Sequence, residues 1–280
     1  MCYYNGKKIS YSELVKLRDL EKQIAAFDDG KLVHKGFDYE KWPIINPVGK
    51  FDWEKLEAEW GFIPDKWFGK KIDTREKVKQ FRNGYVNEKG KFVPGITTLN
   101  AMGEELVLQG KIYREAAING RCIVLSWGFF ESRHIPEMGK RGSILKQPYT
   151  IPHFIGLDNE MAHCFPMAGV QKQWKDEETG EVIDSFAIVT TAAPEGHIMA
   201  YVHNSKRRMP TIFTWEQAER WMYDDLSEPE ITEMATLVFP SHQMHSFSIK
   251  KDYVTSEKPL EPCTYDEEFI STGKAKGLFD

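Results

Sequence analysis

The sequence predicts an α+β fold with a mainly antiparallel sheet. Strand-like and helix-like segments are interspersed along its 280 residues without the regular strand–helix–strand alternation of a doubly wound sheet. No internal repeat appears, which disfavours a repeat architecture. At about 150 residues per domain, the length fits one large domain or a domain with insertions.

Three segments carry apolar residues at helical spacing. Residues 10–27 begin with a serine that can cap a helix, and residues 100–117 show a similar pattern that begins at Asn100. Residues 215–223 follow a threonine in the capping position, Thr214. We therefore expect a helix over each of these ranges.

Other segments carry strand and turn signals. Residues 121–125 and 186–190 are short apolar runs, which predict buried strands. The polar, glycine-centred residues 172–184 predict an exposed hairpin. Residues 66–94 are rich in lysine, asparagine and glycine, which predicts a loop-rich insertion.

Overall charge and composition exclude several classes of protein. The 37 basic and 42 acidic side chains give a formal charge of -5, which argues against a protein that coats nucleic acid through its overall charge. No apolar run approaches the roughly 18 to 20 residues that cross a bilayer, and the polar first residues lack a secretory signal. We therefore expect a cytoplasmic protein without a membrane partner. The four cysteines contain no CxxC pair, so we expect reduced thiols rather than disulfides or a zinc site.

Cys2 is the first residue with unusual chemistry. Because a small second residue favours removal of Met1, we expect Cys2 to become the first residue of the mature chain. It would then carry an α-amine that titrates near ~8 and a thiol that titrates near ~8.5. Such an aminothiol condenses with an aldehyde and closes a thiazolidine ring, or acts as an N-terminal nucleophile in acyl transfer. Chance alone also places cysteine at position 2 in many proteins.

Three further polar residues are candidates for a site, and each has a plainer alternative. Glu131 follows a predicted strand beside two phenylalanines, which would raise its pKa, whereas an edge-strand glutamate facing water is the alternative. Asn100 stands at a predicted helix start, where capping accounts for it. His203 lies just before a basic cluster, and a structural histidine is the alternative there.

Several short motifs follow one another along the chain: Cys2, WGFIP at 60–64, Asn100-Ala101 with Glu104, Tyr113-Arg-Glu-Ala with Arg121-Cys122, GFFE at 128–131, Pro148-Tyr149, Ala168-Gly169, Thr190-Thr-Ala, His203 and Arg208-Met-Pro. In this order and spacing they resemble the SOS response-associated peptidase (SRAP) family, whose members process abasic sites in single-stranded DNA. The resemblance runs from residue 2 to about residue 225.

The resemblance implies a compact α+β domain over residues 1–225, built around a curved, mainly antiparallel sheet with peripheral helices and a basic groove for DNA. Residues 226–280 would form a C-terminal extension packed on the same domain. No glycine-rich phosphate loop appears in the sequence, so no nucleotide cofactor is expected. His242 and His245 lack further ligands nearby in sequence, so no metal is expected.

The resemblance also implies roles for five residues. Cys2 matches the nucleophile that attaches covalently to the ring-opened sugar, and Asn100 matches the residue that positions the amino terminus. Glu131 matches the glutamate that shuttles protons, and His203 matches the histidine that contacts the opened sugar hydroxyl. Arg208 matches an arginine that grips phosphate. Peptidase action on an N-terminus and DNA binding without catalysis are the alternative functions.

The chain departs from the family pattern at three places. Met102 and Tyr4 stand where members commonly have arginines, which removes two cations from the expected DNA groove. The segment between His203 and the RMP motif is longer by three residues. Its Lys206 and Arg207 would restore the missing charge, although a solvated turn is the alternative. For base stacking, the candidates are five aromatic residues, with core packing as the alternative for Phe129: Tyr3, Tyr4, Trp127, Phe129 and Phe130.

Overall fold

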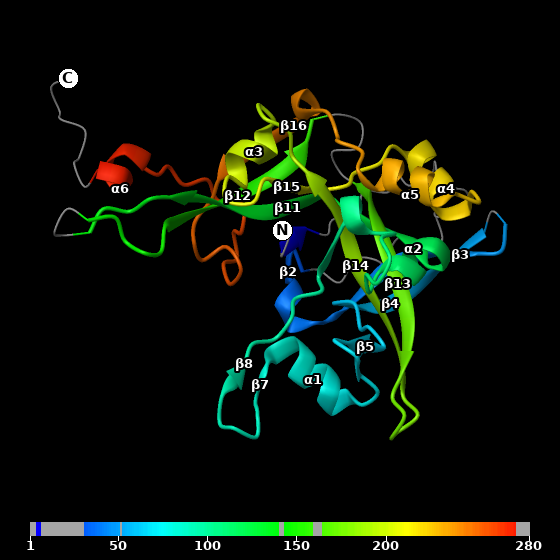
Figure 1. Cartoon of the computed structure of the whole chain (residues 1–280). Helices are drawn as coiled ribbons and strands as arrows, with labels where there is room; N and C mark the ends of the chain where they lie inside the picture. The colour runs from blue at the N-terminus through cyan, green and yellow to red at the C-terminus, as the bar shows by residue number, and fades with distance from the viewer. Residues whose placement is uncertain (1–3, 7–30, 51, 140–142, 159–163, 273–280) are drawn as a thin grey trace, which may run out of the picture.

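The computed structural model describes residues 4–6, 31–50, 52–139, 143–158 and 164–272. The helix expected over residues 10–27 lies outside this part of the chain, as do Cys2 and Tyr3. Two large β-sheets and several peripheral helices make up the fold (Figure 1). The predicted α+β class is therefore confirmed.

The first sheet has five strands, and every pairing in it among the described residues is antiparallel. In spatial order the strands are β16 (Met244–Ser248), β12 (Tyr149–Leu157), β11 (Gly128–Ile135), β1 (Tyr4–Gly6) and β2 (Val33–Lys35). The short strand β1 therefore lies between β11 and the edge strand β2. Figure 1 shows β11 and β12 as long neighbouring arrows.

The second sheet has seven strands and is also mainly antiparallel. Its main path runs β13 (Phe165–Lys175), β10 (Arg121–Ser126), β3 (Lys41–Val48), β4 (Asp52–Trp60), β14 (Val182–Ala192) and β15 (Arg208–Pro210), and β9 (Asn100–Met102) pairs with β14. Only β4 and β9 run parallel to β14 among the described strands. Because β14 pairs with β13 as well as with β4, the sheet curls until its path closes.

The remaining elements are short and lie around the sheets. They are α1 (Arg75–Asn83), α2 (Arg114–Asn119), α3 (Ile198–Val202), α4 (Trp215–Tyr223), α5 (Glu228–Ala235), α6 (Glu267–Thr272), the 3-10 turns η4 (Gly36–Asp38), η5 (Gly103–Glu105) and η6 (Ser241–Gln243), and the small strands β5 (Lys66–Trp67), β6 (Lys70–Lys71), β7 (Tyr85–Val86) and β8 (Phe92–Val93). None of the helices in the described residues is long and apolar enough to cross a bilayer.

Several local predictions are confirmed. Strands β10 and β14 cover the two predicted apolar runs, and β13 with β14 forms the predicted hairpin. Helix α4 has the predicted bounds. The Thr214 hydroxyl accepts a hydrogen bond from the Gln217 N–H, and the Gln217 side chain accepts one from the Thr214 N–H, which completes a capping box.

The prediction of a helix over residues 100–117 is wrong. Residues Asn100–Met102 form β9, which pairs in parallel with β14. The 3-10 turn η5 follows, and only the end of the segment is α-helical, in α2. The Leu99 carbonyl accepts hydrogen bonds from the Trp60 indole and from the Ile188 N–H, both at 3.0 Å. Sheet pairing with distant residues therefore overrides the local apolar spacing.

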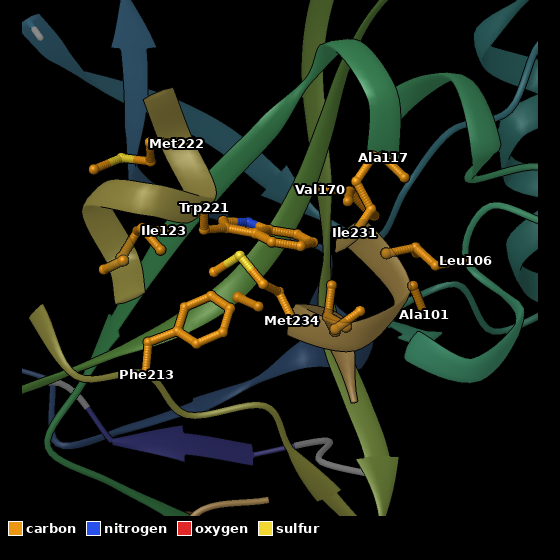
Figure 2. Close-up of a cluster of buried hydrophobic side chains, with 14 of the residues drawn as sticks. Ala101, Leu106, Ala117, Ile123, Val170, Phe213, Trp221, Met222, Ile231 and Met234 are labelled. Atoms are coloured by element: carbon orange, nitrogen blue, oxygen red, sulfur yellow. The ribbon is translucent and has the colours of Figure 1, made fainter. Parts of the chain in front are cut away.

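A large hydrophobic cluster joins α4 and α5 to the second sheet. Figure 2 shows Trp221 at its centre, surrounded by side chains from both helices and from β10 and β13. Trp221 is completely buried, and its indole N–H lies 3.2 Å from the carbonyl oxygens of Cys122 and Gly169. The two helices are thus fixed on the sheet by packing and by hydrogen bonds to strand backbone.

Residues 66–94, which the sequence predicts to be a loop-rich insertion, carry α1 and two small hairpins. The side chain of Thr74 caps α1. The buried Glu59 carboxylate accepts hydrogen bonds from Arg75, at the start of α1, and from Arg82, near its end. These paired charges attach α1 to β4.

Candidate functional site

Glu131 lies in the middle of β11, between β12 and β1, so it is not on an edge strand. Its neighbours Phe129 and Phe130 alternate across the sheet: Phe129 packs in the cluster that contains Met199 and Val202 of α3, whereas Phe130 packs on the opposite face. Glu131 therefore points to the face that α3 covers. Its side chain is 8% exposed, and burial raises the pKa of its carboxyl to about 7.

His203 follows directly after α3, which packs against β11 and β16. It is buried, and burial lowers the pKa of its imidazole to about 4, so the ring is neutral at pH 7. The Nδ1 atom lies 3.0 Å from the Arg208 carbonyl oxygen and 3.4 Å from the Arg208 N–H. The shorter contact favours a proton on Nδ1 that is donated to the carbonyl, which makes Nε2 the hydrogen-bond acceptor.

The N-terminal strand reaches the same place. In β1, Tyr4 pairs with Phe130, the residue next to Glu131, and Asn5 pairs with Phe129. The structure does not describe Cys2 or Tyr3, nor the side chain of Tyr4. Glu131, His203 and the backbone that follows Cys2 are thus contributed by three separate segments.

Asn100 lies on the second sheet, in β9, where it pairs with Ile188 of β14. It is almost buried, and its carbonyl oxygen accepts a hydrogen bond from the Tyr113 hydroxyl at 3.2 Å. The preceding residue, Leu99, packs in the same cluster as Phe129. Asn100 therefore lies where the two sheets meet, rather than at the start of a helix.

The cations predicted for DNA binding differ in their surroundings. The Arg208 guanidinium pairs with both carboxylate oxygens of Glu104, at 2.9 and 2.8 Å, and also donates to the Thr190 carbonyl. Burial alone would raise the pKa of Glu104, but the bonds from Arg208 outweigh it and keep this pKa below its usual value. Lys206 and Arg207, in contrast, are exposed.

Trp127, a predicted stacking residue, is half-buried. Its ring lies 5.0 Å from that of Phe154, centroid to centroid, within the cluster that also contains Phe130. That cluster covers the face of the sheet opposite Glu131. Trp127 therefore packs on the side of β11 that faces away from the Glu131 carboxyl.

A groove of about 730 Å³ opens beside Asn100, and sequence reasoning did not identify it. Trp67 and Phe68 line it with Met102, and Lys111 adds a cation. Phe68 is 88% exposed, and its ring centroid lies 4.8 Å from that of Trp67. The signal in the sequence was an aromatic pair flanked by lysines, KWFGKK at 66–71.

His153 is a second group that sequence reasoning missed. In the β11–β12 register it stands directly opposite Glu131, so both side chains lie on the face under α3. His153 is buried, and burial together with the nearby Arg133 charge lowers its pKa to about 4. No sequence motif indicated His153, because its pairing with Glu131 joins residues from two different strands. The neutral His153 imidazole is thus the cross-strand neighbour of a carboxyl whose pKa lies near 7.

Comparisons with known proteins give one family and several relatives. The profile of the family described as SOS response associated peptidase (SRAP) matches residues 52–255. The chain is 25% identical over 248 residues to the abasic site processing protein HMCES of Gallus gallus, a match that covers 80% of this chain and 62% of the relative. The chain thus spans less than two thirds of that relative's length.

Two solved bacterial structures share the fold. A protein from Bacteroides thetaiotaomicron superposes with a TM-score of 0.67 at 25% identity, covering 92% of this chain and 96% of the other. A protein from Bordetella bronchiseptica gives a TM-score of 0.60 at 18% identity, covering 89% of this chain and all of the other. The second likeness is one of fold alone.

Proposed function

Because the chain belongs to the SOS response associated peptidase (SRAP) family, as its motifs indicated, we propose that it processes abasic sites in DNA. In this proposal it binds single-stranded DNA and forms a covalent thiazolidine crosslink through Cys2, once Met1 has been removed. The name of the related HMCES protein supports the substrate class. The observation that carries the proposal is the buried Glu131, whose pKa near 7 suits it to give and take protons, beside His203 and the N-terminal strand.

Chain length supports a reaction between Cys2 and a substrate near Glu131. Cys2 is two positions before Tyr4, so their Cα atoms lie at most about 7 Å apart. Tyr4 in turn pairs with Phe130, the neighbour of Glu131. An N-terminal α-amine and thiol at that reach are compatible with attack on a sugar that Glu131 protonates.

The proposed reaction begins with the closed hemiacetal of the abasic sugar. The Glu131 carboxyl protonates the ring oxygen, and the Glu131 carboxylate formed in this way accepts the proton that the C1 hydroxyl loses, which opens the ring to an aldehyde. The His203 Nε2 accepts a hydrogen bond from the hydroxyl that ring opening frees. The Cys2 amine then adds to the aldehyde and water leaves, forming an imine, and the Cys2 thiolate adds to the imine carbon while nitrogen takes a proton. The net change is loss of one water.

The groove beside Asn100 supports the DNA part of the proposal. Phe68 and Trp67 offer aromatic faces on which unpaired bases stack, and Lys66 supplies a cation for phosphate, whereas Lys111 is paired with Glu105. Asn100 lines the groove, so a strand bound there would lead toward the proposed reaction centre. A phosphate would have to compete with Glu104 for Arg208, whereas the exposed Lys206 and Arg207 need no such exchange.

A denaturing gel tests the crosslink. Purified protein mixed with a single-stranded oligonucleotide that carries one abasic site is expected to give a slow-migrating adduct, which Cys2→Ala abolishes. Cys263→Ala is the matched thiol control and is expected to leave the adduct unchanged, because Cys263 lies on the C-terminal segment near Ser248. Absence of an adduct from wild-type protein, shown by intact mass to begin at Cys2, would exclude the proposed reaction.

Two alternative functions give different results in the same experiment. DNA binding without any adduct would favour a non-catalytic single-stranded DNA-binding domain. Thiol-dependent peptidase activity would appear as cleavage of a peptide fused before Cys2 and would be lost in Cys2→Ala. The family's description as a peptidase is the reason to test the second alternative.

A further inference from the structure

The segment that carries His203 is attached to β11 at two points. On one side of His203, the Tyr201 carbonyl oxygen accepts a hydrogen bond from the Arg133 guanidinium at 2.8 Å, and the Tyr201 ring stacks under that guanidinium at 3.7 Å. On the other side, the Asn204 side chain donates to the His134 carbonyl at 2.8 Å and accepts from the His134 N–H at 2.9 Å.

These two attachments fix His203 relative to Glu131. Tyr201 and Asn204 flank His203, and their partners Arg133 and His134 follow Glu131 on the same strand. The Asn204 amide uses both its donor and its acceptor on the backbone of one residue, His134, as a neighbouring strand would. The His203 carbonyl also accepts a hydrogen bond from the Arg207 N–H at 2.7 Å, which closes residues 203–207 into a turn before Arg208.

A residue from the C-terminal part of the chain completes the arrangement. Glu267, in α6, accepts two hydrogen bonds from the Arg133 guanidinium, at 2.9 and 3.1 Å, and one from the Tyr201 hydroxyl at 3.3 Å. Glu267 lies beyond residue 255, where the family match ends. The C-terminal segment thus contacts both β11 and the residue two places before His203.

We propose that Arg133, Asn204 and Glu267 form a positioning clamp, which holds the His203 imidazole against the strand that carries Glu131 and so sets the rate of the chemical steps. This inference rests on the proposed function of the same site. The clamp residues act through His203 and do not touch the reacting atoms. Asn204 is one of the four residues between His203 and Arg208, so this lengthened segment supplies its own attachment to the strand.

Single-turnover crosslinking tests the clamp. Asn204→Ala removes both hydrogen bonds to His134 and is expected to slow adduct formation about 10- to 100-fold, because a displacement of about 1 Å in a reacting group has effects of this size. Glu267→Ala is expected to slow it less, since Arg133 keeps its contacts with Tyr201. Ser205→Ala is the matched control, one residue from Asn204 on an exposed position, and is expected to react at the wild-type rate.

A double variant separates positioning from general destabilisation. In a His203→Ala background, Asn204→Ala is expected to slow crosslinking less than twofold further, because the residue it positions is gone. An equal slowing in both backgrounds, or no slowing by Asn204→Ala alone in a folded protein, would overturn the clamp. Affinity for the oligonucleotide is expected to stay at the wild-type value in Asn204→Ala.

An NMR measurement tests the clamp independently of the crosslinking reaction. The His203 Nδ1–H signal is expected to be sharp in the wild-type protein, because it is bonded to the Arg208 carbonyl, and to broaden or vanish in Asn204→Ala but not in Ser205→Ala. An unchanged His203 signal in Asn204→Ala would overturn the clamp, even if wild-type protein forms no adduct. Failure of wild-type protein to crosslink would instead count against the proposed function.

Discussion

Replacement of Glu131 by glutamine should change how stability depends on pH. Burial raises the pKa of this carboxyl from 4.5 to about 7, a difference of 7 - 4.5 = 2.5 units. At 1.36 kcal/mol per unit, this corresponds to about 3 kcal/mol. The folded state keeps the proton up to about pH 7, whereas the unfolded chain loses it above about pH 4.5. Wild-type protein therefore loses about 3 kcal/mol of unfolding free energy between these pH values, and Glu131→Gln avoids this loss.

Urea unfolding at pH 4 and pH 8 measures the effect. The difference in unfolding free energy, Glu131→Gln minus wild type, should be about 3 kcal/mol larger at pH 8 than at pH 4, so the variant gains stability relative to wild type as the pH rises. Glu104→Gln is the control of opposite sign, because the bonds from Arg208 keep the pKa of Glu104 low. The ionised Glu104 side chain stabilises the folded protein above the pKa that Glu104 has in the unfolded chain, and this stabilisation is lost on acidification. Glu104→Gln should therefore reduce the unfolding free energy more at pH 8 than at pH 4. An equal difference between Glu131→Gln and wild type at both pH values would refute the reasoning.

Three further predictions concern DNA binding and the core. Phe68→Ala should weaken binding of a single-stranded oligonucleotide by about 1–3 kcal/mol, whereas Phe92→Ala, an exposed aromatic outside the groove, should not, as fluorescence anisotropy can measure. Neutralising Lys206 and Arg207 with glutamine should reduce the slope of log affinity against log salt by about 1.4, because each phosphate contact on a single strand contributes about 0.7; an unchanged slope would remove both from the interface. Trp221→Ala should lower the unfolding free energy by about 3–5 kcal/mol in a denaturant titration, and a loss below 1 kcal/mol would contradict the packing in Figure 2.

The success and failure of the fold predictions follow the range of the interactions involved. Helix α4 was predictable because its cap, its apolar spacing and its end lie within residues 214–223. The hairpin of β13 and β14 was predictable because the two strands are joined by a short polar turn. The helix prediction for residues 100–117 failed because β9 forms its hydrogen bonds with β14, almost ninety residues later in the chain.

The site residues were predictable to a different degree. The motifs around Glu131 and His203 are continuous in the sequence, so these residues were identified as candidates directly. His153 carries no motif, and only the β11–β12 register brings it opposite Glu131. Phe68 stands beside lysines in the sequence, but its 88% exposure depends on how residues 66–71 fold over the second sheet.

The sequence by itself determined the family, the α+β class and the chemical groups available to the site, because these depend on residue types and their order. The tertiary structure decided how those groups behave. The pKa of Glu131 is raised to about 7 and that of His203 is lowered to about 4 because burial in the folded protein removes both side chains from water. The positive charge of Arg208 is paired with the Glu104 carboxylate because folding brings together two residues more than one hundred positions apart. Ionisation and pairing depend on neighbours in space, and no local pattern of residues encodes those neighbours.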